Sequence, residues 1–381
     1  MNDIARAWNI DELRRMAKRR LPRGVFDFFD GGAEDEKTLA ANRAAFDRVR
    51  FLPKVLVDVS KIDTRTDLFG VQANWPLAIA PTGAIGIAWP GADVATARAA
   101  AAFGIPYTLS TVATTSIERL AREAPGRHWF QLYILRDREF SMKLVARAQA
   151  ADYEALMVTV DLPVGGKRER DYRNDYTVPF RPSLRNLSDF IAHPAWALRL
   201  LTRGVPQMEN LAGMAAGSLS PGLIASTVGR NLDASFDWDR LKAMRDVWPR
   251  KLIVKGVCRP EDAERLAALG CDAIVVSNHG GRQLDGAVGT LDALSGVVRA
   301  VGERAAVFFD SGIRRGGEAV KALALGAKAI LIGRATLYGV AAAGEPGARR
   351  ALEILTDEFV RTMQLCGVTR ISEIQPELLS S

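Results

Sequence analysis

Residues Leu252–Ser277 read LIVKGVCRPEDAERLAALGCDAIVVS and contain one complete strand–helix–strand unit. The runs Leu252–Gly256 and Ala273–Ser277 are short, apolar and rich in β-branched residues, and each ends in small or polar residues, which predicts buried strands. Between them, Pro260–Leu269 is rich in alanine and leucine at helical spacing. Strands that alternate with helices in this way are parallel and are joined by right-handed crossovers.

The same unit recurs along the chain. Further strands are predicted at Leu77–Pro81, Tyr107–Thr111, Trp129–Tyr133, Ala155–Val160, Ala306–Asp310 and Ala329–Ile332. Further helices are predicted at Gly91–Ala102, Ser116–Arg122 and Gly316–Leu325. Eight strand–helix units favour a closed (β/α)8 barrel, the TIM barrel, over a doubly wound sheet. The predicted fold class is therefore α/β, with the barrel at residues 77–345.

The sequence outside these units is predicted to form three further parts. Residues 1–76 resemble a helical cap plus a short extended segment at one end of the barrel. Residues 346–381 resemble a C-terminal helix and tail. An insertion at about 165–235 separates the fourth strand from its helix, and segments of that length are usually functional or mobile.

The middle of this insertion, Leu187–Leu201, is both apolar and basic. Its apolar side chains are Phe190, Ile191, Trp196, Leu198, Leu200 and Leu201. Arg199 lies among them, and Arg203 lies just beyond the segment. An amphipathic segment that contacts a membrane surface explains this composition. A helix packed on the protein's own surface explains it nearly as well, so both interpretations stay open here.

Composition sets the class of protein. The chain has 381 residues, is 48% hydrophobic and has a mean hydropathy near zero, as expected of a soluble globular protein. Cys258, Cys271 and Cys366 are too few and too scattered for a disulfide framework or a metal-ligand cluster, so a reducing compartment is expected and no metal. No signal peptide and no run of roughly twenty apolar residues are found. We expect a cytoplasmic protein, either free or peripheral on the inner face of the cell membrane.

The net charge of +7 and the pI near 9.4 suit three kinds of partner: nucleic acid, an anionic membrane or anionic small molecules. The densest basic run, Arg14–Arg23 (RRMAKRRLPR), is predicted to be a solvated helix face. No zinc finger, RNA-binding sheet motif or basic zipper is found, so nucleic acid is not expected as a partner.

The stretch Ile274–Gly286, IVVSNHGGRQLDG, carries the clearest chemistry. A buried strand runs directly into His279, and Arg282 follows after two glycines. A titratable base three residues from a fixed cation suits proton abstraction from an anionic substrate. The alternative is a capped strand end with a surface arginine.

Polar side chains lie at or just beyond the C-terminal end of every predicted strand, and these ends are where such barrels build their active sites. They are Pro81-Thr82-Gly83, Ser110, Gln131 with Tyr133, Thr159 with Asp161, Lys255, Ser277 with His279, Asp310, and Gly333-Arg334. A packed scaffold alone would not favour a polar residue at each of these ends. The convergence therefore predicts a site.

The last two strand ends indicate a phosphate site. The first is followed by Asp310-Ser311-Gly312-Ile313-Arg314-Arg315-Gly316-Gly317 and the second by Gly333-Arg334. Glycines let backbone N–H groups approach an anion, helix starts add their dipole, and arginines add charged hydrogen bonds. The alternative for Arg314 and Arg315 alone is a surface pair. Lys255 ends an apolar strand, so its buried ammonium needs an anionic partner, which a reduced flavin would provide.

The sequence resembles the FMN-dependent L-2-hydroxy acid oxidases and dehydrogenases, a family of TIM barrels. The resemblance covers almost the whole chain and rests on LPRGVFDFFDGGAEDE, APTG, FQLY, TVDLP with KRERD, IVKGV, SNHGGRQLDG, DSGIRRG, KALALGA and IGRATLYG. SNHGGRQLD is its most specific motif. Within the family, the mandelate dehydrogenase branch is most similar, on PTG, LSTVATTSIERLA and HPAWALRLLTRGVPQ.

The resemblance implies a role for each matching residue. His279 takes the substrate proton and Asp161 orients its ring. Arg168 and Arg282 hold the substrate carboxylate, and Tyr133 lies near the substrate oxygen. The implied FMN contacts are Pro81, Thr82, Gly83, Ser110, Gln131, Thr159, Lys255, Ser277, Asp310, Ser311, Gly312, Ile313, Arg314, Gly333 and Arg334. The resemblance also implies a homotetramer.

Two residues depart from the family pattern. Phe28 stands where the family usually has a tyrosine that binds the substrate carboxylate, so we expect weaker binding of small hydroxy acids or a preference for a larger apolar substituent. Gly83 stands where the oxidases commonly have alanine, which matches the dehydrogenases.

The expected reaction is oxidation of a mandelate-like L-2-hydroxy acid to the 2-keto acid, with electrons passing through FMN to a quinone or another acceptor. The nearest alternative is an oxidase that passes them to oxygen and makes hydrogen peroxide. A more distant alternative is a basic protein that binds a membrane surface or nucleic acid with an inert barrel.

Overall fold

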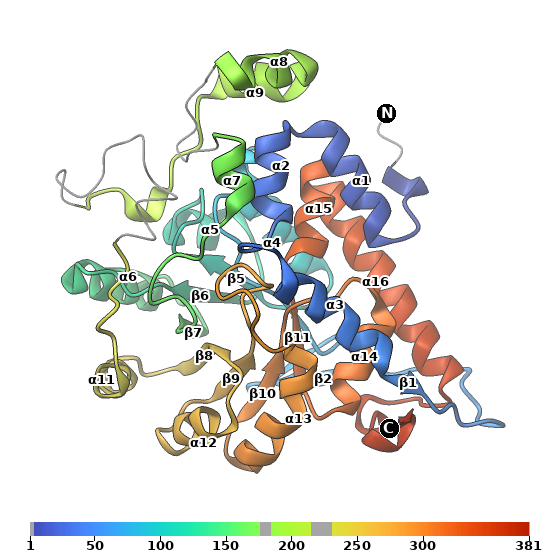
Figure 1. Cartoon of the computed structure of the whole chain (residues 1–381). Coiled ribbons are helices and arrows are strands. Elements are labelled where there is room, and N and C mark those ends of the chain that lie inside the picture. The colour runs from blue at the N-terminus through green and yellow to red at the C-terminus, as the bar shows by residue number, and fades with distance from the viewer. Residues whose placement is uncertain (1–3, 176–183, 215–230, 381) are drawn as a thin grey trace.

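The computed structural model describes residues 4–175, 184–214 and 231–380. Eight parallel strands close into one barrel in the order β10-β11-β4-β5-β6-β7-β8-β9 (Figure 1). They are β4 (Leu77–Ile79), β5 (Tyr107–Ser110), β6 (His128–Leu132), β7 (Ala155–Thr159), β8 (Lys251–Val257), β9 (Ala273–Val276), β10 (Ala306–Phe309) and β11 (Ala329–Ile332). The pair Leu77 and Ile330 belongs to the β4–β11 ladder that joins the first strand to the last. The predicted (β/α)8 barrel is confirmed.

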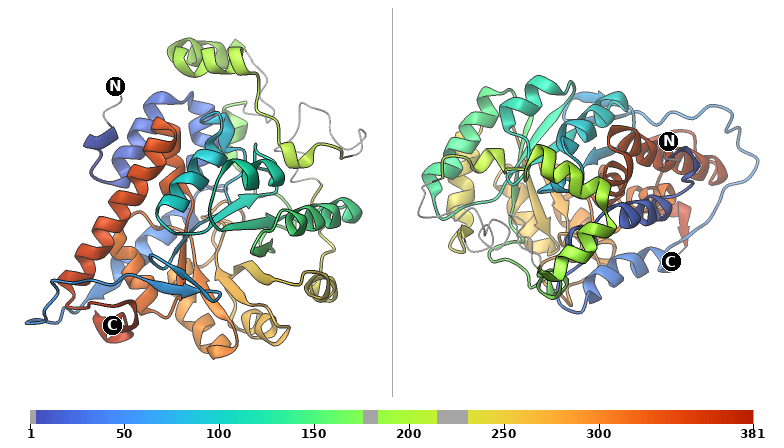
Figure 2. Two further views of the ribbon diagram at one scale, coloured as in Figure 1. Left: turned by 180° about the vertical axis from the view of Figure 1, so that it is seen from behind. Right: turned by 90° about the horizontal axis from the view of Figure 1, so that it is seen from above.

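Helices surround the barrel and bury the outer faces of its strands (Figure 2). They are α4 (Ala92–Ala102), α5 (Ile117–Glu123), α6 (Arg138–Ala150), α11 (Trp238–Val247), α12 (Pro260–Ala268), α13 (Thr290–Val301), α14 (Gly316–Ala324), α15 (Arg334–Ala343) and α16 (Glu345–Leu365). Side-chain caps start several of them, because Ser116, Asp137 and Asp237 each accept a hydrogen bond from a first-turn backbone N–H. The short 3-10 helices are η1 (Ile4–Arg6), η2 (Ile85–Ile87), η3 (Glu209–Leu211), η4 (Gly302–Arg304), η5 (Ile371–Glu373) and η6 (Pro376–Leu378).

Most predicted strands end one or two residues too late, whereas β8 extends one residue further at each end than predicted. The overlong ends are Pro81, Thr111, Tyr133, Val160, Ser277 and Asp310, all of which lie in the loops beyond the observed strands. The backbone N–H groups of Thr111, Val160 and Asp310 still donate to the neighbouring strands, and the chain turns away after these last hydrogen bonds. The predicted helices are correct to within one residue at each end.

The opposite end of the barrel is closed by an aromatic plug. A hairpin of β2 (Thr66–Leu68) and β3 (Val71–Ala73) places Phe69 at its turn. The Phe69 ring lies 5.6 Å from that of Trp129 and 5.5 Å from that of Phe308, and these two rings stack inside the barrel. The barrel is therefore open only at the C-terminal ends of its strands.

Helices from the N-terminal segment cover part of that open end. α1 (Ile10–Arg20) packs along α15, and α2 (Arg23–Asp30) and α3 (Lys37–Arg48) follow it. The turn between α2 and α3 reaches the loop after β9, where the Ala33 N–H donates to the Gly281 carbonyl at 2.8 Å. The C-terminal strand β12 (Leu379–Ser380) pairs with β1 (Arg50–Phe51), which follows α3, in a small two-stranded sheet. Residues from the described part of this segment, 4–76, thus contact both ends of the barrel.

The prediction that Arg14–Arg23 forms a solvated helix face is wrong for two of its arginines. Arg14 makes a two-pronged ion pair with the buried Asp30, at 2.6 and 2.8 Å. The Arg20 guanidinium lies over the Trp89 ring, 4.3 Å from its centroid. Sequence periodicity could not show either contact, because both partners lie outside α1.

The segment between β7 and α11 contains helices of its own. They are α7 (Glu169–Arg173), α8 (Leu184–Ala192) and α9 (Pro194–Arg203), and the last two project beyond the barrel (Figure 1). Trp196 anchors α9, because it is buried and its indole N–H donates to the Ile87 carbonyl at 2.8 Å. Ile191 and Leu201 face outward, 71% and 83% exposed. Among the helices of the described residues, none is long and apolar enough to cross a membrane.

Candidate active site

His279 lies at the mouth of the barrel, just after β9, and its ring is held from both sides. Its Nδ1 lies 2.9 Å from Oδ1 of Asp161, and its Nε2 lies 3.3 Å from the hydroxyl of Tyr133. Its backbone has a φ of +59°, a left-handed conformation that β-carbon crowding disfavours. The His279 N–H donates to Oγ of Ser277 at 3.1 Å, which helps to fix this conformation.

The environment of His279 favours the neutral imidazole. Burial lowers its pKa below the usual value of 6.5, and the charges of Lys255 and Arg282 lower it further, while Asp161 opposes them. Burial by itself would raise the pKa of Asp161, but its interactions with His279 and the charge of Lys255 bring it below its usual value. A neutral ring held by an ionised carboxylate is the form of a general base that is ready to take a proton.

Two arginines converge on one aromatic ring beside His279. The guanidinium carbons of Arg168 and Arg282 lie 5.9 and 5.5 Å from the centre of the Phe28 ring. Arg282 also donates to the Gly31 carbonyl at 2.9 Å, and burial together with the charge of Arg168 lowers its pKa. Nε of Arg168 is buried without a hydrogen-bond partner. Two close cations with an unsatisfied donor fit a carboxylate ligand.

Lys255 brings a fully buried cation to the same site. Its ammonium donates to Oγ of Ser277 at 2.9 Å and lies 3.3 Å from Oδ2 of Asp310. Burial by itself would lower the pKa of Lys255, but the carboxylates of Asp310 and Asp161 raise it above its usual value. The side chain therefore stays charged among polar neighbours on three adjoining strands.

A chain of amide and hydroxyl groups crosses the floor of the site. Oε1 of Gln131 accepts from the Ser110 hydroxyl at 3.1 Å, and its Nε2 donates to Oγ1 of Thr159 at 3.0 Å. All three side chains are buried at the ends of β5, β6 and β7. These contacts fix the direction of the Gln131 amide.

The loop after β10 has the tight backbone expected of an anion site. Ser311 and Gly312 both have positive φ, +82° and +108°, and a β-carbon at Gly312 would lie 2.9 Å from the Asn42 carbonyl oxygen. The Ile313 side chain is buried in the core, so only its backbone can face a ligand. Arg314 lies over the Tyr338 ring and donates to the Ile313 carbonyl at 2.7 Å.

The loop after β11 leads into α15 through Gly333. No side chain caps α15, so its first N–H groups point toward the mouth of the barrel without a capping partner. The Arg334 side chain is directed to carbonyls of three residues, Phe29, Gly31 and Gly280. It therefore ties the N-terminal helices to the loop after β9.

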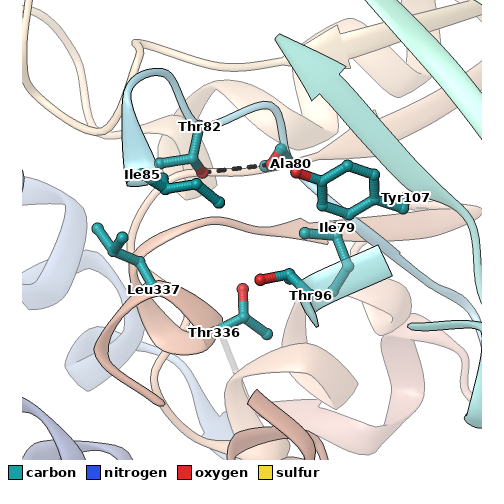
Figure 3. A pocket seen from close by; sticks show the side chains of 8 residues that line it. All are labelled: Ile79, Ala80, Thr82, Ile85, Thr96, Tyr107, Thr336 and Leu337. Carbon is teal, nitrogen blue, oxygen red and sulfur yellow. Dashed lines mark hydrogen bonds between the residues drawn. The ribbon is translucent and has the colours of Figure 1, made fainter. Parts of the chain in front are cut away.

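Pro81, Thr82 and Gly83 form the loop after β4, where space is tight. A β-carbon on Gly83 would lie 2.3 Å from Cγ2 of Val112, so only glycine fits without movement. Below this loop lies a cavity of about 10 Å³, which is room for about one water molecule (Figure 3). Its hydroxyl-bearing walls include Thr82, Thr96 and Thr336.

Sequence reasoning missed residues that hold these loops. Asn42 and Asn278 are buried and exchange two side-chain hydrogen bonds, at 2.8 and 2.7 Å, which fasten α3 to the loop after β9. The Gly31 carbonyl oxygen, which accepts from Arg282, was missed as well. Adjacent glycines in FDGGAEDE were the only available signal, because a backbone acceptor leaves no side-chain trace.

Comparison with known proteins shows the family to which the chain belongs. The family model described as FMN-dependent dehydrogenase matches residues 17–381. The chain belongs to this family. It is 43% identical to (S)-mandelate dehydrogenase of Pseudomonas putida, over 98% of this chain and 94% of that protein. It is 44% identical to a putative L-lactate dehydrogenase of Mycobacterium tuberculosis, over 98% and 89%.

A solved structure described as the monotopic membrane protein (S)-mandelate dehydrogenase has the same fold. It superposes with a TM-score of 0.94 at 43% identity and covers 98% of this chain and 99% of that one. The family assignment makes this enzyme an FMN-dependent oxidoreductase. The resemblance seen in the sequence is confirmed, and so is the mandelate dehydrogenase-like character of the chain.

The residues present fit FMN. The uncapped start of α15 suits a phosphate group, and the buried Lys255 suits a ring edge that gains negative charge on reduction. Gln131, Ser110 and Thr159 supply donors and acceptors for amide-like ring edges. These features lie at the C-terminal ends of strands that surround His279.

Proposed function

We propose that the enzyme oxidises an L-2-hydroxy acid with an aromatic or other large substituent, of the mandelate type, to the 2-keto acid. The observation that carries this proposal is the position of His279 between Asp161 and Tyr133, with Arg168 and Arg282 beside it. A 2-hydroxy acid needs a cationic clamp for its carboxylate and a base for its proton.

In the proposed mechanism, Arg168 and Arg282 hold the substrate carboxylate and Tyr133 hydrogen-bonds near the substrate oxygen. Nε2 of His279 takes a proton from the substrate, and Asp161 stabilises the imidazolium that forms. Bound FMN supplies the two-electron acceptor. Lys255 would lie at the edge of the ring that becomes negative, and the loops at Pro81–Gly83, Asp310–Arg314 and Gly333-Arg334 would hold the ring, ribityl chain and phosphate.

The substituent is proposed from Phe28. Its ring lies where the two arginines meet and offers an apolar surface without a hydroxyl. The Pseudomonas putida relative is a mandelate dehydrogenase, which agrees with an aromatic substrate. Comparing kcat/KM for mandelate, lactate and glycolate, with the His279→Gln enzyme as the inactive reference, tests the choice. A preference for glycolate would contradict it.

The proposed acceptor is a membrane quinone. Support comes from Gly83, which matches the dehydrogenases of the family, and from the relative that is a monotopic membrane protein. Reoxidation of the reduced enzyme by oxygen and by a soluble quinone, followed by stopped-flow absorbance, separates the two acceptors. Fast reaction with oxygen would instead favour the oxidase.

Peripheral membrane association and a homotetramer complete the proposal. α8 and α9 project from the barrel with Ile191, Leu198 and Leu201 exposed, which suits contact with lipid. Flotation of the enzyme with vesicles tests the membrane contact, and light scattering of the detergent-solubilised enzyme tests the tetramer. Flavin absorption at about 450 nm distinguishes the enzyme from the more distant alternative, an inert basic barrel.

A further inference from the structure

The basic junction between α1 and α2 lies beside the projecting helices α8 and α9. The last turn of α1 contains Lys18, Arg19 and Arg20. The Arg23 N–H donates to Oδ2 of Asp189, a residue of α8, at 2.5 Å. The basic run that stood out in the sequence is therefore next to the surface that we propose to contact the membrane (Figure 2).

Two arginines from these separate segments stack on one indole. The guanidinium carbons of Arg20 and Arg199 each lie 4.3 Å from the centre of the Trp89 ring. They therefore lie within about twice that distance of each other. Trp89 itself is fixed, because Gly344 leaves only enough room for its ring: a β-carbon there would lie 2.6 Å from Cε2 of Trp89.

In the part of the chain that the structure describes, no carboxylate pairs with the two arginines of this stack. Nε and Nη2 of Arg20 are buried without a hydrogen-bond partner, and neither Arg20 nor Arg199 has an ion pair among the residues that the structure describes. Arg203, one helical turn from Arg199, adds a third cation, and burial and this neighbouring charge lower the pKa of Arg199. Close cations without a carboxylate between them favour an anionic ligand.

The two stacked arginines also lie behind the exposed apolar side chains of α9, on the side nearer the barrel. Trp196 and Arg199 are three residues apart in α9 and so share its protein-facing side, whereas Leu198 and Leu201 are 61% and 83% exposed. If the two leucines enter the acyl region, the arginines behind them lie at the level of the lipid phosphates.

We propose that Arg20 and Arg199, stacked on Trp89, bind the phosphate of an anionic phospholipid headgroup. This inference rests on the proposed membrane association and adds to it a site and a lipid preference. The apolar residues of α8 and α9 would insert into any bilayer, whereas the arginine pair would select anionic lipid. Lys18, Arg19 and Arg23 would add a less specific attraction to the same surface.

The test measures partitioning of the FMN-loaded enzyme into phosphatidylcholine vesicles with and without phosphatidylglycerol. Wild type should prefer the vesicles that contain phosphatidylglycerol. The double variant Arg20→Gln/Arg199→Gln should lose roughly thirty-fold in that preference, since each cation near an anionic surface contributes about fivefold. Arg20→Lys/Arg199→Lys, which keeps both charges, should restore most of it.

Matched controls separate this site from net charge and from apolar insertion. Arg122→Gln/Arg361→Gln removes the same charge from exposed positions on α5 and α16 and should keep the preference. Leu198→Gln/Leu201→Gln should weaken binding to both kinds of vesicle. Turnover with a soluble dye acceptor shows that each variant is folded.

Two failures are distinguishable. If Arg20→Gln/Arg199→Gln keeps the wild-type lipid preference, or if wild type binds both vesicles equally, the headgroup site is overturned while membrane association stands. If wild type binds neither vesicle, the proposed membrane association itself is overturned.

Discussion

Arg282 and Arg334 donate to the same acceptor, the carbonyl oxygen of Gly31, at 2.9 and 2.7 Å. Arg282 belongs to the proposed substrate clamp, and Arg334 follows the strand whose end is proposed to bind the FMN phosphate. One backbone oxygen from the turn between α2 and α3 therefore connects the two halves of the site. The turn between α2 and α3 therefore holds one arginine from each half of the proposed site.

Replacing Gly31 by alanine should weaken binding of both the substrate and FMN. The new β-carbon would lie 2.9 Å from the Asp27 carbonyl oxygen and 3.2 Å from Cδ of Arg170, so the turn must shift. Loss of a hydrogen bond to a charged group costs about 1.5–3 kcal/mol, which is roughly a tenfold or larger effect. We expect the KM for the hydroxy acid and the Kd for FMN both to rise.

Gly296→Ala provides the control, because this helical glycine meets only Cγ of Pro260, at 3.3 Å. Steady-state kinetics gives KM, and fluorescence titration of the apoenzyme gives the Kd for FMN. An increase in KM with no change in the Kd for FMN would show that the Gly31 carbonyl does not position Arg334.

Phe28 should determine both the arginine geometry and the choice of substrate. Phe28→Tyr would add a hydroxyl near the carboxylate clamp and should raise kcat/KM for lactate by about tenfold or more, since a hydrogen bond to a charged group contributes about 1.5–3 kcal/mol. Phe28→Leu removes the ring from Arg168 and Arg282 and should raise KM severalfold, at about 0.5–2 kcal/mol for each cation–π contact.

Phe29→Leu is the matched control for Phe28, because Phe29 packs edge-on against it and is also buried. The measurement is kcat/KM for lactate and for mandelate in all four enzymes. No gain for either acid in the Phe28→Tyr enzyme would refute the assignment of Phe28 to the carboxylate site.

The pH profile should be that of a base with a depressed pKa. Since burial, Lys255 and Arg282 lower the pKa of His279 below 6.5, the acid limb of kcat/KM should lie at lower pH than for an ordinary histidine, and kcat/KM should be level by neutral pH. Asp161→Asn removes the charge that raises this pKa, so the acid limb should move to lower pH. It should also lower kcat by about 100-fold or more, because the protonated ring loses its partner.

Tyr133→Phe is the comparison for this profile, since its hydroxyl contacts the other ring nitrogen and carries no charge. Its acid limb should stay where it is in wild type. An acid limb that does not move in the Asp161→Asn enzyme would show that the carboxylate does not stabilise the protonated ring.

Gly83→Ala should lower the stability of the fold because the new methyl group would clash with one neighbour, Val112. Its β-carbon would lie 2.3 Å from Cγ2 of Val112, and overpacking of this kind costs about 1–3 kcal/mol in the free energy of unfolding. Val112→Ala in the same chain should recover most of the loss. Urea unfolding of the two single variants and the double variant measures the coupling, and additive effects would mean that Val112 simply rotates away.

The barrel could be predicted from sequence because it repeats a local pattern. Strands and helices differ in the spacing of their apolar residues, so each can be recognised locally. Eight alternating strand–helix units are then compatible with only a few topologies. The site followed from the same pattern, since His279, Lys255 and Gln131 each lie within two residues of the C-terminal end of a predicted strand, and parallel strands bring these ends together.

The partners of several arginines could not be predicted from the sequence, because they lie on segments far away along the chain. Arg334 was expected to hold the phosphate, but its side chain reaches the carbonyls of Phe29, Gly31 and Gly280. Whether Arg334 also contacts bound FMN stays a prediction. The basic run in α1 was interpreted from composition alone, and its Asp30 and Trp89 partners are visible only in three dimensions.

The left-handed backbone conformation of His279 makes the fold less stable, although the proposed chemistry needs a histidine at this position. A side chain with a β-carbon in this conformation costs on the order of 1 kcal/mol relative to glycine. A sequence optimised only for stability would place glycine or asparagine at position 279, and such a protein would lack the proposed base. Programs of stabilising substitution on this enzyme should therefore leave the turn after β9 untouched.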